Sequence, residues 1–290
     1  MKTAVIIPIY NVADFLGEAI ESVIQQQADK TEVIVVDDGS EEAAAAHIQQ
    51  ICSAFPEVQL VRQPQNAGPA AARSAGLQET QADYVVFLDA DDCLHPQALA
   101  IFHRHLSQHP DAIACYGKVR MMQADGTLST SPPKPDNPDY LLAGEPLLRA
   151  LVEGHQIIRS GGAICIRQEV VANIPAVNHH LRLGEDWVLW CHLALRGTII
   201  PAGEDVVLYK RSHGQNISQK LLETPDVLFD SVQTVFEDAA FAQALGEDYM
   251  CRHYREAMKF SHAYLAKKYG QVNDRDEAQY HLQQTLLFKT

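Results

Sequence analysis

The sequence predicts an α/β protein with a mainly parallel, Rossmann-like sheet flanked by helices. Two observations predict it. Short apolar runs without polar alternation, typical of strands buried on both faces, are separated by stretches whose apolar residues recur every three or four positions, typical of helices. Right-handed crossovers place the carboxyl ends of such strands at one edge of the sheet, where ligands gather. The residues that follow each strand are therefore the candidates for a functional site.

The N-terminal part of the chain alternates between these two patterns. The expected strands are residues 4–9, 32–36, 58–61 and 84–88. A helix is expected after each of the first three strands, and Ser40 can cap the second helix. Polar residues follow every strand. We therefore expect Tyr10, Asp38, Asn66 and Asp91 to converge on one crevice.

The acidic run after the fourth strand predicts a metal site. Asp89 and Asp91 lie two positions apart, so both would point to the same side of an extended chain. Carboxylate oxygens suit Mg²⁺ or Mn²⁺, the ions that carry substrate phosphates. The alternative is that Asp92 caps the helix expected near Pro96 and that the other two carboxylates are solvated loop charges.

Composition and charge narrow the class of protein. With 23 basic and 37 acidic residues the formal net charge is −14, which argues against nucleic-acid binding and general attachment to anionic lipid. No segment approaches the roughly 20 apolar residues that span a bilayer, and the start predicts a strand, not a signal peptide. Six scattered cysteines predict reduced packing residues. We expect a cytoplasmic protein, with peripheral contact at the inner face of a membrane left open.

The rest of the chain predicts further strands and a helical end. Strands are expected at residues 112–122, 163–166 and 206–209, with a flexible turn at 160–162, and helices at 145–152 and from residue 185. The proline-rich residues 131–138 are either an exposed connector or a flap near an acceptor. From about residue 221, long helical patterns predict an appendage of three or so helices.

Four blocks together resemble a known family. They are VIIPIYN at 5–11, VVDDGS at 35–40, NAG at 66–68 with ARSAG at 72–76, and LDADD at 88–92. In order and spacing they resemble the successive blocks of the family 2 glycosyltransferases of GT-A fold. The resemblance implies a nucleotide-diphosphate sugar donor, with a UDP-sugar as the first candidate, and an inverting transfer to a glycan or lipid-linked acceptor. It also implies a divalent ion, Mn²⁺ or Mg²⁺, at the Asp-x-Asp element.

The resemblance also assigns the donor-binding residues. Pro8 and Tyr10 would line the base pocket, and Asn66 belongs to the same donor site. Asp38 would accept a hydrogen bond from the ring NH of uracil or thymine, since an imide NH needs an acceptor. Arg73 would lie beside the nucleotide or diphosphate and offset its charge.

The residues expected near the metal come from two segments, the acidic run after the fourth strand and the segment at 210–218. Asp91 would be the direct metal ligand, while Asp89 would contact the ribose or the water shell of the ion. The segment KRSHGQNIS at 210–218 resembles the basic and histidine-containing ending of the same family. There Lys210 and Arg211 would offset phosphate charge, and His213 is either a further metal ligand or a surface residue.

The segment GEDWVLW at 184–190 supplies the candidate base. Acidic residues at a helix start are commonly partners of the helix dipole, but this pair resembles the Glu-Asp element of the family. Inverting transfer needs one carboxylate to take the proton of the acceptor hydroxyl. Adjacent carboxylates on a helix point in different directions, so only one can face the sugar. We assign Asp186 as the base and Glu185 as its orienting neighbour, with the exchange of roles left open.

The predicted organisation has two parts. Residues 1–220 form the glycosyltransferase domain, with a nucleotide-binding half at 1–110 and an acceptor half at 111–220, and residues 221–290 form the helical region. Two other functions stay open: a catalytically silent nucleotide-sugar-binding or scaffold protein, and a nucleotidyltransferase. The second lacks the Gly-rich basic loop expected after the first strand. A homo-oligomer is possible on this sequence.

Overall fold

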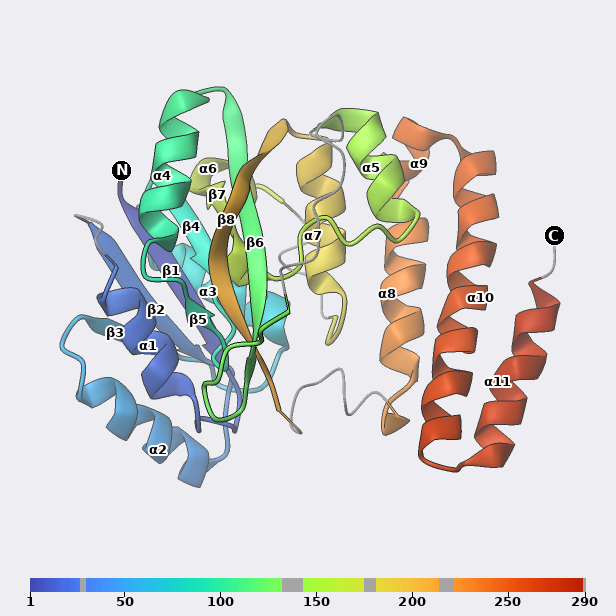
Figure 1. Cartoon of the computed structure of the whole chain (residues 1–290), viewed down its shortest axis with the longest axis horizontal. Coiled ribbons are helices and arrows are strands. Elements are labelled where there is room, and N and C mark those ends of the chain that lie inside the picture. Colours follow the sequence, from blue (N-terminus) through green and yellow to red (C-terminus); the bar gives the residue numbers. More distant parts are fainter. Residues whose placement is uncertain (27–29, 132–142, 175–180, 214–221, 289–290) are drawn as a thin grey trace.

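The structure is a computed structural model that describes residues 1–26, 30–131, 143–174, 181–213 and 222–288. Within these residues the strands form one sheet in the order β3-β2-β1-β4-β7-β6-β8-β5. Helices cover both faces of the sheet, and the C-terminal helices lie beyond α7, one past the other, on the side away from the β1–β3 strands (Figure 1). The proline-rich residues 132–138 and the end of the 210–218 segment lie outside the described residues.

The first four strands are parallel, as predicted. The strands are β1 (Thr3–Ile9), β2 (Thr31–Asp37), β3 (Val58–Arg62) and β4 (Tyr84–Phe87). The helices between them are α1 (Leu16–Ile24), α2 (Glu42–Ser53) and α3 (Pro69–Gln78). This confirms the strand–helix alternation and brings the carboxyl ends of β1, β2 and β4 to one edge.

Burial on both faces explains the uninterrupted apolar runs. In β1, Val5 and Ile7 point into the core that contains α1 and α4, whereas Ala4 and Ile6 point into the core that contains α3, α5 and α7. All four side chains are fully buried. Because consecutive strand residues face opposite sides, a strand between two helical layers needs apolar residues at every position.

The second half of the sheet is less regular than predicted. Its elements are β5 (Cys93–Leu94), α4 (Ala98–Gln108), β6 (Ala112–Gln123), α5 (Gly144–Val152), η1 (Gly161–Ala163), β7 (Ile164–Arg167), α6 (Gln168–Val171), α7 (Glu185–Ala194) and β8 (Thr198–Ser212). β7 runs antiparallel between β4 and β6. β8 is much longer than the expected 206–209 because it follows β6 through register shifts that absorb the polar residues in its middle.

The turn before β7 is packed, not flexible. Gly161 and Gly162 are buried. A Cβ on Gly161 would lie 2.6 Å from the carbonyl oxygen of Phe87, and one on Gly162 would lie 2.8 Å from Leu208 Cδ1. The glycines are there because the backbone passes this close to β4 and β8, which corrects the expected flexible turn.

The C-terminal region contains four described helices, where three or so were expected: α8 (Asp226–Phe236), α9 (Ala239–Leu245), α10 (Glu247–Gln271) and α11 (Arg275–Leu287). Val232, Phe241 and Met250 from three of these helices belong to the same core as α7 and the sheet. The helical appendage is therefore packed onto the α/β part. Among the described residues, none of the helices has the length and apolarity to cross a membrane.

Candidate active site

The ends of β1 and β2 are fastened to each other. Asn11 takes a left-handed φ of 60°, and its N–H donates to Ser40 Oγ at 2.9 Å, while its Oδ1 accepts from the Glu41 N–H at 2.9 Å. The predicted role of Ser40 as a helix cap is wrong, because α2 begins after Glu41 without a side-chain cap. The Ser40 hydroxyl instead holds the loop that carries Tyr10.

Asp38 ties β2 to the loop before α3. Its carboxylate accepts from the N–H groups of Ala67 at 3.0 Å and Gly68 at 2.8 Å, and from Gln63 Nε2 at 3.0 Å. Burial raises the pKa of Asp38, although the two backbone N–H groups act against this. Asp38 therefore shapes the expected base pocket, and its contact with a ring NH stays a prediction.

The other expected pocket residues lie at this same edge. Tyr10 is 44% exposed and Pro8, near the end of β1, is partly buried. Asn66 precedes the N–H groups that bind Asp38, and among the described residues its buried Oδ1 has no hydrogen-bond partner. An exposed aromatic ring and an unpaired amide acceptor therefore lie at the edge where the base pocket was predicted.

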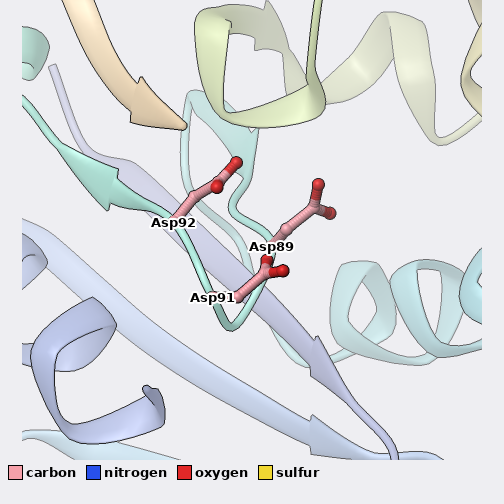
Figure 2. A group of neighbouring side chains, drawn as sticks. All are labelled: Asp89, Asp91 and Asp92. Carbon is pink, nitrogen blue, oxygen red and sulfur yellow. The ribbon is translucent and has the colours of Figure 1, made fainter. Parts of the chain in front are cut away.

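Three carboxylates meet on the turn after β4 (Figure 2). One oxygen from each of Asp89, Asp91 and Asp92 lies within 4.8 Å of the others. Asp92 is buried, its Oδ1 accepts from the Arg211 N–H at 2.8 Å, and its Oδ2 has no partner among the described residues. Burial, together with the charges of Asp89 and Asp91, raises the pKa of Asp92. Hard oxygen ligands in this arrangement fit Mg²⁺ or Mn²⁺.

The alternative placement of Asp92 as a helix cap is wrong. α4 begins at Ala98 after Gln97, and its start has no side-chain cap. Asp92 was not among the residues assigned to the metal, yet its unpaired oxygen makes it a candidate ligand. Its place in the acidic run was the only sequence signal.

The end of β8 faces the acidic turn. His213 Nε2 lies 2.8 Å from Asp91 Oδ2, and its ring packs on Phe15 with centroids 4.9 Å apart. Burial disfavours the charge of Lys210, but the carboxylates of Asp89 and Asp92 outweigh it and raise the pKa of Lys210. His213 and Lys210 thus join the acidic turn where the sequence placed them.

The structure gives Arg211 a different place from the one expected. Its side chain has no exposure and its guanidinium is used within the fold: Nε donates to the Asp91 carbonyl at 2.9 Å and Nη2 to Glu18 Oε2 at 2.6 Å. The guanidinium also lies 4.3 Å from the Phe15 ring centroid. Arg211 therefore anchors the acidic turn and does not present its charge to a diphosphate. No sequence pattern indicated the pair with Glu18, which lies 193 positions away.

Arg73 connects the acidic turn to the start of α7. Nη1 lies 2.5 Å from Glu185 Oε1 and Nη2 lies 3.3 Å from Asp89 Oδ1, with only 8% of the side chain exposed. Burial disfavours the charge, but Glu185 and Asp89 outweigh it and raise the pKa of Arg73. Among the described residues Nε has no partner. Blocks 112 positions apart thus meet at one guanidinium.

The two acidic residues of α7 have different surroundings. Glu185 is held by Arg73 and its side chain is 11% exposed. Asp186 accepts only from the neighbouring Trp187 N–H, at 2.8 Å, among the bonds that the structure describes. It lines a cavity of about 940 Å³ that also contains Lys210 and that lies between β6, α5, α7, α8 and α10.

The fold is the GT-A fold of glycosyltransferases, and comparison with known proteins gives the family. Residues 4–173 match the family model described as glycosyl transferase family 2. The chain belongs to this family. S. aureus TarS 1–349 superposes on it with a TM-score of 0.63 at 15% identity, covering 100% of this chain and 92% of that one. The predicted fold class is therefore confirmed.

Relatives share only part of their length with this chain. A Haemophilus influenzae protein named an uncharacterized glycosyltransferase is 30% identical over 186 residues, which is 63% of this chain and 59% of that protein. The poly(ribitol-phosphate) beta-glucosyltransferase of Bacillus spizizenii is 26% identical over 212 residues, 72% of this chain and 32% of that protein. Streptococcus pneumoniae GlyA is 31% identical over 128 residues, and 18% of its length is covered.

Proposed function

We propose that the chain is an inverting glycosyltransferase that moves a sugar from a nucleotide-diphosphate sugar, with UDP as the first candidate, to an acceptor hydroxyl. The observation that carries the proposal is the position of Arg73, which joins Asp89 of the acidic turn to Glu185. This contact supports a donor site close to the start of α7, where the proposed base Asp186 lies, as sugar transfer requires. TarS has been crystallised with UDP and with UDP-GlcNAc, which supports a uridine donor for this fold.

The donor would lie along the strand ends. Pro8, Tyr10, Asp38 and Asn66 would hold the base, and Arg73 and Lys210 would face the diphosphate. Asp89, Asp91 and His213, with Asp92 added by the structure, are the residues that would hold a divalent cation. When bound, such an ion offsets the negative charge that develops on the leaving diphosphate.

Asp186 is the proposed base. In the reaction its carboxylate accepts the proton of the acceptor hydroxyl as that oxygen attacks the anomeric carbon. The bond between this carbon and the diphosphate oxygen breaks, its electron pair stays on the diphosphate, and the configuration inverts. Because Asp186 faces the cavity while Glu185 is bound to Arg73, the geometry favours Asp186 over Glu185.

The first test is thermal stabilisation by UDP, GDP, CDP, dTDP and ADP, each with and without Mn²⁺. A ligand that binds the native state raises its stability, by about 2.7 kcal/mol at a hundredfold excess over the dissociation constant. We expect a Mn²⁺-dependent shift with UDP. Turnover of the UDP-sugar that EDTA abolishes supports the enzyme, whereas binding without turnover supports the catalytically silent protein.

A further inference from the structure

We propose that the acceptor of this chain carries an extended hydrocarbon group, and that this group occupies the cavity between α7, α8 and α10. The inference rests on the proposed function, because it describes the second substrate of the same site. The described wall of the cavity runs from Lys210 on β8 and Asp186 on α7 to Phe260 on α10. An acceptor hydroxyl at Asp186 therefore places the remainder of its molecule among these helices.

Apolar side chains from several elements face this space. They include Leu151, Ile158, Leu183, Leu228, Val232 and Ala257. The volume of about 940 Å³ is at the upper end of the range for small-molecule sites. These apolar side chains stabilise hydrocarbon by removing it from water.

Three polar groups on the helical side of this wall are turned to the protein itself. Ser231 Oγ donates to the Leu228 carbonyl at 2.9 Å, and Ser261 Oγ donates to the Ala257 carbonyl at 2.9 Å. The Trp187 indole N–H donates to the Leu151 carbonyl at 2.8 Å. These three donors are thus already used. What remains toward the cavity is the apolar part of each side chain.

The charged groups of the wall have both signs. Glu153, Asp186 and Glu256 line the cavity, and so do Arg120, Arg159 and Lys210. Because the two signs balance, the charges favour neither an anionic nor a cationic group, and the apolar side chains decide which ligand fits.

Phe260 extends the apolar surface outward from the cavity. It lines the cavity, yet 72% of the residue is exposed. Exposed apolar surface that continues an apolar cavity marks a site for an apolar partner. A hydrocarbon chain longer than the cavity would cover this ring.

Tryptophan fluorescence tests the inference without any turnover. The chain has two tryptophans, Trp187 and Trp190, and both line the cavity. We would titrate the full chain with methyl, butyl, hexyl and octyl glucosides below their micelle concentrations. A saturable change is expected, with affinity rising about fourfold for each added methylene that is buried. No saturable change, or affinity independent of chain length, would overturn the inference.

A matched pair of variants sharpens the test. Phe260→Ser should weaken octyl glucoside binding severalfold, and Leu287→Ser should leave it unchanged, because Leu287 on α11 is also 72% exposed but does not line the cavity. Equal effects of both variants would contradict the proposal. Circular dichroism and melting temperature check that both variants fold.

The two proposals fail separately. If octyl glucoside binds as expected but no nucleotide stabilises the chain, the glycosyltransferase proposal fails and the hydrocarbon site stands. If the chain binds UDP and transfers sugar with rates independent of the alkyl length of the acceptor, the glycosyltransferase stands and the hydrocarbon site fails.

Discussion

At the proposed donor edge, the residues that follow the strands hydrogen-bond to one another, whereas the cavity beyond α7 is lined by apolar side chains and by polar groups such as Ser231 and Ser261, which bond to their own helices. Asn11 meets Ser40, Asp38 meets the N–H groups of Gly68 and Ala67, and Arg73 meets Asp89. The donor edge is thus built from short motifs that fix backbone turns. The cavity is lined by residues far apart in sequence, many of them apolar and the others carrying charges of both signs. Short motifs that fix backbone turns can be recognised in a sequence, so the donor edge allows the family to be predicted. Residues scattered along the chain form no such motif, so the cavity does not allow the acceptor to be predicted.

The largest effect is expected for a variant of the donor edge. Asp91→Ala should remove Mn²⁺-dependent stabilisation by UDP and lower transfer by at least about 10²-fold, the loss seen when one group that stabilises developing charge is removed. Thermal shifts and initial rates measure this. Asp111→Asn, an exposed carboxylate distant from the site in sequence, should change neither. Unaltered Mn²⁺ dependence in Asp91→Ala would contradict the metal assignment.

The next largest effect is expected at Asp186, which lies between the donor edge and the cavity. Asp186→Asn should lower transfer about 10²- to 10⁴-fold, the usual contribution of a general base, and leave the UDP shift intact. Glu185→Gln is the comparison, since it loses the charge that faces Arg73. A larger loss of transfer in Glu185→Gln, with UDP binding kept, would exchange the two roles.

Arg73→Ala breaks the contact that joins the regions. It leaves Glu185 buried without its cation, which costs about 3–5 kcal/mol in comparable pairs. Denaturant unfolding should show this loss. Arg149→Ala is the control, because the Arg149–Glu145 pair lies on an exposed helix face, where ion pairs contribute little to stability. Similar losses of unfolding free energy in both variants would mean that the Arg73–Glu185 pair stabilises the fold no more than the exposed pair does.

Gly161→Ala tests the close packing of the turn before β7 against β4. The new Cβ would lie 2.6 Å from the Phe87 carbonyl oxygen, and overpacking of this kind costs about 1–3 kcal/mol. Gly17→Ala is the control, since nothing lies within 4 Å of its Cβ position. Unfolding free energies compare the two variants, and no loss in Gly161→Ala would contradict the close packing of the turn.

The smallest effect lies farthest from the donor edge. His262 Nδ1 and His281 Nδ1 are 2.9 Å apart between α10 and α11, and burial lowers the pKa of both, with Glu277 opposing this at His281. Because the folded pKa lies below the unfolded one, the stabilisation is complete above about pH 6.5 and is lost as the pH falls below it. The protection of the α11 amides from hydrogen exchange, corrected for the intrinsic pH dependence of exchange, should fall below this pH, and less so in His281→Gln.

The sequence was sufficient where structure depends on neighbours in the chain. The parallel strands β1 to β4, the acidic turn and the start of α7 lie where their patterns predicted them. Patterns of burial and turn residues are local, so no knowledge of distant contacts was needed.

The sequence was insufficient where a residue finds its partner far along the chain. The basic character of Arg211 suggested a phosphate contact, but Glu18 holds its guanidinium inside the fold. The glycines at 161 and 162 suggested flexibility, but Phe87 and Leu208 require their small size. The reversed direction of β7 also depends on which strands flank it, and its apolar run is the same in either direction.

The position of Arg73 has a thermodynamic consequence for the site. A cation that binds Asp89 competes with Arg73 for the same carboxylate, and the other arm of this arginine holds the first residue of α7. The two equilibria are then linked: a change at the start of α7 that alters its grip on Arg73 alters the affinity for the cation, and the cation acts on that grip by the same factor. One side chain thus links occupancy of the proposed cation site to the start of α7.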